Sequence, residues 1–158
     1  MATITSLLKP ATGNSQRGRN PYMVERTLDI VATTVDPSSG DVVQAITIPA
    51  NTKILSAGIQ VVESATMNTG TDATVTLGAA DADEYVTAFD IDGAADGAYA
   101  PSATVAADVV LTSADTLDVT FAGTGASFTA GKLRVYAIMM DVSEQGDTSA
   151  DEVSRDQA

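Results

Sequence analysis

Tyr22-Met23-Val24-Glu25-Arg26-Thr27-Leu28-Asp29-Ile30 is the stretch at which this chain changes from irregular to regular sequence. Large apolar side chains fall on alternate positions, at Tyr22, Val24, Leu28 and Ile30. Polar side chains fall between them, at Glu25, Thr27 and Asp29. A period of two over this length is typical of a half-buried β-strand. We therefore predict that a β-rich body begins at residue 22.

Segments of the same kind recur along the rest of the chain. Further strands are predicted at residues 42–48, 53–63, 73–77, 105–111, 116–121 and 132–142. In the second of these, one face is expected to hold Leu55, Ala57, Ile59 and Val61. Turn sequences such as Asp36-Pro37-Ser38-Ser39-Gly40-Asp41 separate the strands, because Pro fixes φ and Gly accepts positive φ. Short strands about ten residues apart, without a long helical pattern, predict an all-β fold, either a single β-sandwich or a jelly roll.

Residues 81–92 allow two interpretations. Asp83 could cap a single helical turn that holds Tyr85, Val86 and Phe89, or the segment could form an edge strand. The pattern alone leaves both open.

The length of 158 residues suits one domain with one core. We expect three parts: an extended N-terminal arm at 1–21, the sandwich at 22–142, and a flexible acidic tail at 143–158. The tail holds five Asp or Glu residues and one large apolar side chain, Val153, so it cannot bury enough surface to fold alone.

The arm carries basic residues and no acid within the first 23 positions. It combines these charges with large aliphatic side chains, which a purely solvated tail has little use for. The alternative is a disordered tail. We interpret the arm as a segment that lies on another surface, with six contact candidates: Ile4, Leu7, Leu8, Lys9, Arg17 and Arg19.

The overall charge argues against several partners. The chain has a net charge of −13, and residues 54–131 contain no Lys or Arg. Because phosphate binding depends on Lys and Arg, we expect no nucleic acid and no anionic membrane as a partner of the body. Neither a membrane span nor a secretory signal is expected, and the protein should be made and kept soluble.

The sequence also gives little support for catalysis or metal binding. The chain has no Cys and no His, which removes a Ser-His-Asp triad and Cys-based metal sites. The acidic loop at 81–96 invites a Ca²⁺ hypothesis, but its acids do not have EF-hand spacing, so we expect solvated surface carboxylates. Chance carboxylate pairs without any Trp do not indicate a glycosidase. We expect no enzymatic activity, no cofactor and no bound metal.

Four segments resemble small virion proteins of tailed bacteriophages, in particular the capsid decoration, or cement, proteins of phages of marine and freshwater bacteria, including cyanobacteria. They are Ile48-Pro49-Ala50-Asn51-Thr52-Lys53-Ile54-Leu55-Ser56-Ala57-Gly58-Ile59, Thr74-Val75-Thr76-Leu77-Gly78, Ser113-Ala114-Asp115-Thr116-Leu117-Asp118-Val119-Thr120 and Gly131-Lys132-Leu133-Arg134-Val135-Tyr136-Ala137. The resemblance spans roughly residues 45–140 and rests on strand and turn pattern. It implies a β-sandwich or jelly roll on the outside of an icosahedral shell, with no catalytic residues.

The resemblance also implies partners and a location. It implies binding to the major capsid protein and assembly as a homodimer or homotrimer, and we expect the trimer. The location would be the outer capsid surface of the virion, after synthesis in the host cytoplasm. An arm that orders on binding could hold capsomers together across their seams, and an oligomer would multiply weak contacts.

Two alternatives remain: a tail, baseplate or fibre component that adheres to the host surface, and a small carbohydrate-binding module. Exposed aromatic side chains on one sheet face would favour the carbohydrate-binding module. We expect instead that the scattered aromatic residues belong to the core or its rim: Tyr85, Tyr99, Phe121 and Phe128.

Overall fold

A computed structural model describes the backbone of residues 3–4 and 9–10, together with residues 21–32, 35–67, 70, 72–100, 110–123 and 128–142. Within these ranges the regular structure is entirely β and includes no helix. The strands are β1 (Thr3–Ile4), β2 (Lys9–Pro10), β3 (Tyr22–Asp29), β4 (Val42–Ile48), β5 (Thr52–Met67), β6 (Thr74–Gly78), β7 (Val86–Asp90), β8 (Val110–Leu111), β9 (Asp115–Ala122) and β10 (Phe128–Asp141). The predicted all-β class is confirmed.

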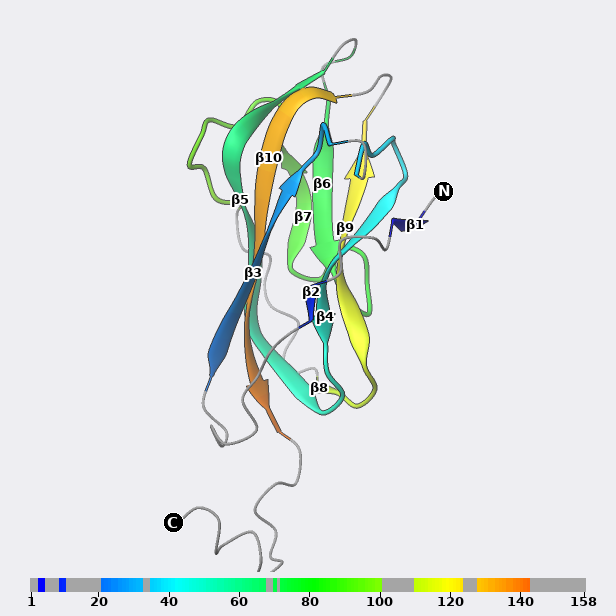
Figure 1. Cartoon of the computed structure of the whole chain (residues 1–158), viewed down its shortest axis with the longest axis vertical. Coiled ribbons are helices and arrows are strands. Elements are labelled where there is room, and N and C mark those ends of the chain that lie inside the picture. The colour runs from blue at the N-terminus through cyan, green and yellow to red at the C-terminus, as the bar shows by residue number, and fades with distance from the viewer. Residues whose placement is uncertain are drawn as a thin grey trace, which may run out of the picture.

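The strands form two sheets that pack face to face along the long axis of the molecule (Figure 1). Sheet A has the order β1-β4-β9-β6-β7, with β2 also paired to β4, and sheet B has the order β3-β10-β5-β8. From β3 to β10, successive strands alternate between the sheets, except that β6 and β7 are neighbours in sheet A. The predicted β-sandwich is confirmed, whereas a jelly-roll connection stays a prediction.

Small branched side chains fill the space between the sheets. The core residues that are fully buried come from both sheets, for example Val43 and Val119 from sheet A and Ile59 and Val135 from sheet B. Aromatic residues join them, since the rings of Phe121 and Phe128 meet edge to face with centroids 6.0 Å apart. Burying such side chains supplies the main free energy that holds the sheets together.

The first predicted strand follows its sequence pattern. In β3, Val24 and Leu28 are buried, and Ile30 continues the buried face just beyond the strand. Glu25, Thr27 and Asp29 point outward and are exposed. Strand β4 begins and ends at the predicted residues 42 and 48.

One predicted position in β5 is wrong. Ala57, Ile59 and Val61 are buried as expected, but Leu55 is only half-buried. The register with β10 shifts between Ile138, which opposes Ser56, and Met139, which opposes Ile54, so Leu55 is the extra residue of a β-bulge. A bulge changes the phase of a strand, and periodicity does not reveal it.

The ambiguous segment at 81–92 forms an edge strand and not a helical turn. Strand β7 pairs with β6 at the outer edge of sheet A. Tyr85, just before the strand, and Val86, its first residue, are buried, and Phe89 packs against the core while partly exposed. Of the predicted strand at 105–111, β8 accounts for 110–111 and the remainder lies outside the described residues. No helix of the described ranges is long and apolar enough to cross a membrane.

Candidate assembly surfaces

Two short pieces of the predicted arm, β1 and β2, pair with β4 at the edge of sheet A. Strand β1 pairs with β4 in parallel, with Thr3 opposite Val42, and β2 continues the pairing further along β4, with Lys9 opposite Ile46. An open strand edge offers unpaired N–H and C=O groups to any other strand. Backbone pairing with residues 3–4 and 9–10 therefore covers the edge that β4 would otherwise present.

The structure places two of the six contact candidates, and the proposed contact of all six stays a prediction. Ile4 lies in β1 and Lys9 lies in β2. The other four lie outside the described residues: Leu7, Leu8, Arg17 and Arg19. The acidic tail at 143–158 lies outside them as well.

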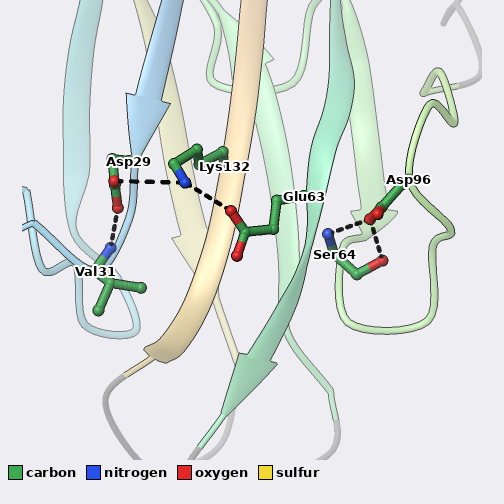
Figure 2. Close-up of polar contacts among 6 residues, drawn as sticks. All are labelled: Asp29, Val31, Glu63, Ser64, Asp96 and Lys132. Carbon is green, nitrogen blue, oxygen red and sulfur yellow. Dashed lines mark hydrogen bonds and ion pairs between the residues drawn. The ribbon is translucent and has the colours of Figure 1, made fainter.

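The outer face of sheet B carries a charged half, in which ions of opposite sign alternate across three strands. Lys132 of β10 lies between Asp29 of β3 and Glu63 of β5 because the strand register places all three in one row. The Lys132 Nζ is 2.7 Å from Glu63 Oε2 and 4.0 Å from Asp29 Oδ2 (Figure 2). The hydrogen bond to Glu63 is the main reason that the pKa of Lys132 is raised.

Arg134 occupies the next outward position of β10 and is paired in a similar way. Its Nη1 donates to Gln60 Oε1 at 3.2 Å, and its Nε lies 4.0 Å from Glu25 Oε2. These side chains are about half exposed, so solvent screens the charges and the pairs contribute little to stability. Their main effect is to neutralise this half of the face.

The other half of the same face is mainly apolar, although Lys53 lies opposite Met140 and Glu25 lies opposite Tyr136. Tyr136 lies across Gly58, where an added Cβ would come within 2.5 Å of the tyrosine hydroxyl oxygen. Its ring meets Tyr99 at a centroid distance of 6.2 Å and an angle of 71°. We call this half the apolar patch, and its residues are Met23, Leu55, Tyr99, Tyr136, Ile138 and Met140.

Two members of the apolar patch are largely open to solvent. Met23 is 60% exposed and Tyr99 is 59% exposed. Met23 lies opposite Ile138 on one side of β10, and Tyr99 lies on the other side, where it forms a bridge with Gln60 of β5. The segment that carries Tyr99 is held to β5 by backbone bonds from Val61 N to Ala98 O and from Ala100 N to Ile59 O.

The outer face of sheet A has a different chemistry. Strands β4, β6, β7 and β9 hold no Lys or Arg, and the outward positions of β6 and β9 carry mainly Thr and Asp. Burial raises the pKa of Asp118 there, although a hydrogen bond with Thr116 opposes the shift. Within the described residues, Asp118 Oδ1 and Thr76 Oγ1 are buried and have no hydrogen-bond partner.

The acidic loop at 81–96 has structural partners for several of its carboxylates. Asp96 Oδ1 accepts a bond from the Ser64 backbone N–H at 2.7 Å, which holds the loop to β5 (Figure 2). Asp90 accepts from Gly93 N–H, which lowers the pKa of Asp90, whereas burial raises the pKa of the adjacent Asp92. No cluster of three or more His, Cys, Asp or Glu that could hold a metal ion occurs in the described part of the chain.

No model of a known protein family matches the sequence, and no curated protein matches it. Solved structures do match. A chain of the acid-stable capsid of Helicobacter pylori bacteriophage KHP30 is 15% identical with a TM-score of 0.54, and the match covers 76% of this chain and 86% of that one. The fold is one that occurs in phage capsids.

Two further phage capsids contain chains of the same architecture. In the capsid asymmetric unit of cyanophage Pam1, the match has a TM-score of 0.59 at 15% identity and covers 82% of this chain and 91% of that one. In the capsid of Ralstonia phage GP4, the TM-score is 0.58 at 14% identity, with coverage of 85% and 97%. Because most of both partners is covered each time, the matching capsid chains are close to this chain in length.

Sequence reasoning missed the apolar patch. Tyr85, Phe121 and Phe128 are buried, in agreement with the prediction that they belong to the core or its rim, but Tyr99 is exposed on the face of sheet B. Two signals were present. Met23 falls between the buried positions of its strand, and residues 135–140 of β10 are apolar at consecutive positions, which is typical of a strand covered on both faces.

Proposed function

We propose that this chain is a capsid decoration, or cement, protein that binds the outer surface of a phage capsid and stabilises contacts between capsomers. The observation that carries the proposal is a shared fold over most of the length of similarly short chains in three phage capsids. The three phages infect different bacteria, which favours a role in the capsid shell over a role in binding one particular host surface. The partner would be the major capsid protein, and synthesis would take place in the host cytoplasm.

The arm at 1–21 supplies the proposed attachment. Residues 3–4 and 9–10 already follow an extended course along β4. Between these two short strands stand Leu7 and Leu8, and beyond them stand Arg17 and Arg19. We expect the leucines to enter apolar grooves on the capsid and the basic residues to meet capsid carboxylates.

Burial should dominate over charge in this attachment. Burying one large aliphatic side chain contributes about 1.5–3 kcal/mol, so Leu7 and Leu8 together would contribute about 3–6 kcal/mol. An exposed ion pair contributes about 0–1 kcal/mol, and the charges act mainly on association rate and salt sensitivity. A Leu7→Ala/Leu8→Ala variant should therefore lose more affinity than a variant in which Lys9, Arg17 and Arg19 are neutralised.

The test measures binding to expanded capsids that lack the protein, by co-sedimentation with the wild-type chain and the two variants. Deleting residues 1–21 should abolish attachment and leave the sandwich folded. That deletion also uncovers the edge of β4, so the leucine pair is the cleaner variant. Unchanged affinity of the leucine variant and of the truncated chain would exclude the arm as the attachment site. Copy numbers in the tens, from mass spectrometry of purified virions, would instead favour a tail or fibre component.

One observation bears on the carbohydrate-binding alternative. Tyr99 and Tyr136 do lie on one sheet face, as such a module would require. Their ring planes stand at 71° to each other, however, and so do not form a flat platform on which a sugar ring could stack. This geometry favours contact with protein over contact with sugar.

A further inference from the structure

The apolar patch gathers six apolar or aromatic side chains on one sheet face and is flanked by paired charges. Met23 and Tyr99 expose 60% and 59% of their surface on either side of β10. Between them, β10 presents Tyr136, Ile138 and Met140 outward. Contiguous apolar groups with a polar rim on one face are typical of an interface between proteins.

The charge on the outer face of sheet B fits a second copy of this chain as the partner. Two copies of a chain with a net charge of −13 repel each other at most orientations. The outer face of sheet B is an exception, because the outward positions of β3, β5 and β10 carry equal numbers of basic and acidic side chains: Lys53, Lys132, Arg134, Glu25, Asp29 and Glu63. The longer strands of sheet A differ in this respect, since β4, β6, β7 and β9 contain acids and no base, and Lys9 of the short strand β2 adds a base at one edge.

We propose that two copies of this chain associate through the outer faces of their sheets B, with apolar patch against apolar patch. The contact is isologous, so each copy contributes the same residues and the assembly closes at two. Sheets that pack face to face interleave their side chains at about 10 Å separation, which would bury Met23 and Tyr99. The dimer takes the place of the trimer expected from the sequence.

The close approach of Tyr136 to Gly58 indicates that the Tyr136 ring is held in place on the sheet, as a contact surface requires. A side chain at position 58 would collide with the Tyr136 hydroxyl, so glycine leaves room for the ring over β5. A ring that is held against both β5 and Tyr99 has few alternative positions, so it loses little conformational entropy when another molecule covers it. The patch is thereby organised before the partner arrives.

The test is the mass of the full-length chain in solution, measured by sedimentation equilibrium over micromolar concentrations. The wild type should have twice the 16.1 kDa of one chain. Met23→Asp places a charge in the patch, and Tyr99→Ser removes an exposed ring, so each should weaken dimerisation at least tenfold. Both positions are exposed in the single chain, so both variants should keep its fold and its circular dichroism spectrum.

Thr87→Asp is the matched control. Thr87 is exposed on β7, an edge strand of sheet A, as Met23 is exposed on β3, an edge strand of sheet B. Both substitutions add one negative charge to each copy. The Thr87 variant should remain dimeric with an affinity within about twofold of the wild type. If the Thr87→Asp variant dissociates as fully as Met23→Asp, the added negative charge and not the apolar patch would explain the loss of dimer, and the proposal fails.

Salt gives an independent readout. Because both copies are strongly acidic and the patch is apolar, raising the ionic strength should screen the repulsion and tighten the dimer, or leave it unchanged. A dimer that weakens as salt is added would be held by ion pairs and not by the apolar patch, which would overturn the proposal. A wild-type mass of one chain or of three chains would overturn it as well. All measurements use the isolated chain, so such a failure would leave the proposed capsid attachment standing.

Discussion

Gly131 combines a positive φ with close packing, and replacing it with alanine tests the packing of β10. Its φ of +142° lies where side chains are rarely tolerated, and an added Cβ would come within 2.6 Å of Ile30 Cδ1 and 3.1 Å of Ala65 Cα. The pairing of β10 with β5 also shifts register on either side of it, between Ala130 and Lys132. The Gly131 carbonyl accepts a bond from Ile30 N–H at 3.2 Å, which ties the bulge to the end of β3.

Two costs add at this position. A backbone conformation that only glycine adopts easily costs about 1–3 kcal/mol for alanine. Forcing a methyl group into a packed site costs about 1–3 kcal/mol more, because Ile30 is fully buried and one of the close atoms belongs to the Ala65 backbone. Gly131→Ala should therefore lower the free energy of unfolding by about 2–6 kcal/mol, a large part of the ~5–15 kcal/mol available to a domain.

Gly40→Ala is the matched control, because Gly40 also has positive φ, at +86°, but a Cβ there meets nothing within 4 Å. It should cost about 0.5–2 kcal/mol, since backbone strain is partly offset by the loss of unfolded-state freedom. Urea unfolding at one protein concentration, followed by circular dichroism, measures both variants. With a urea dependence of about 2 kcal/mol/M, the midpoint of Gly131→Ala should lie roughly 1 M below that of Gly40→Ala. Equal midpoints would refute the steric argument.

Two further predictions concern buried groups. Phe121→Ala removes a buried ring that packs edge to face on Phe128, and thermal or urea unfolding should show a loss of about 3–5 kcal/mol. Asp118→Asn should raise the melting temperature at about pH 7 and lose this advantage at about pH 3. Burial raises the pKa of Asp118, so the native state loses stability as pH rises from the unfolded pKa through the folded one. A melting temperature of Asp118→Asn equal to that of the wild type at both pH values would contradict that account.

The sequence predicted the architecture well where one periodicity governs a strand. The buried positions of β3 follow from hydrophobic alternation, because one face of the strand packs on the core. The bounds of β4 agree with the prediction as well, although its phase shifts at Ala45 and Ile46, which are both buried. The likeness to phage capsid chains confirms that pattern recognition reached the correct kind of fold. The expected decoration function and the arm contacts remain proposals.

The sequence did not predict features that depend on how strands pair, such as a β-bulge or the pairing of a short edge strand. The bulge at Leu55 depends on the register between β5 and β10, which forms between segments far apart in the chain. The segment at 81–92 was ambiguous because a short run such as Tyr85-Val86 suits a helical turn and a strand equally well. Pairing of β7 with β6 decides the matter, and such pairing is a tertiary interaction.

The apolar patch is not predicted from the sequence because the type of an aromatic residue does not reveal which face of its strand it occupies. In β10, Leu133, Val135 and Ala137 point inward and are buried, whereas Tyr136 and Ile138 point outward. One strand thus carries two apolar faces, of which the sandwich core uses only the first. Substitutions on the inward face should lower the stability of the single chain, whereas those on the outward face should act chiefly on its association. The two effects can be told apart, because unfolding measurements report the stability of one chain and the mass in solution reports its association. If outward substitutions lowered stability as much as inward ones and left the mass unchanged, the outward face of β10 would not be an interface.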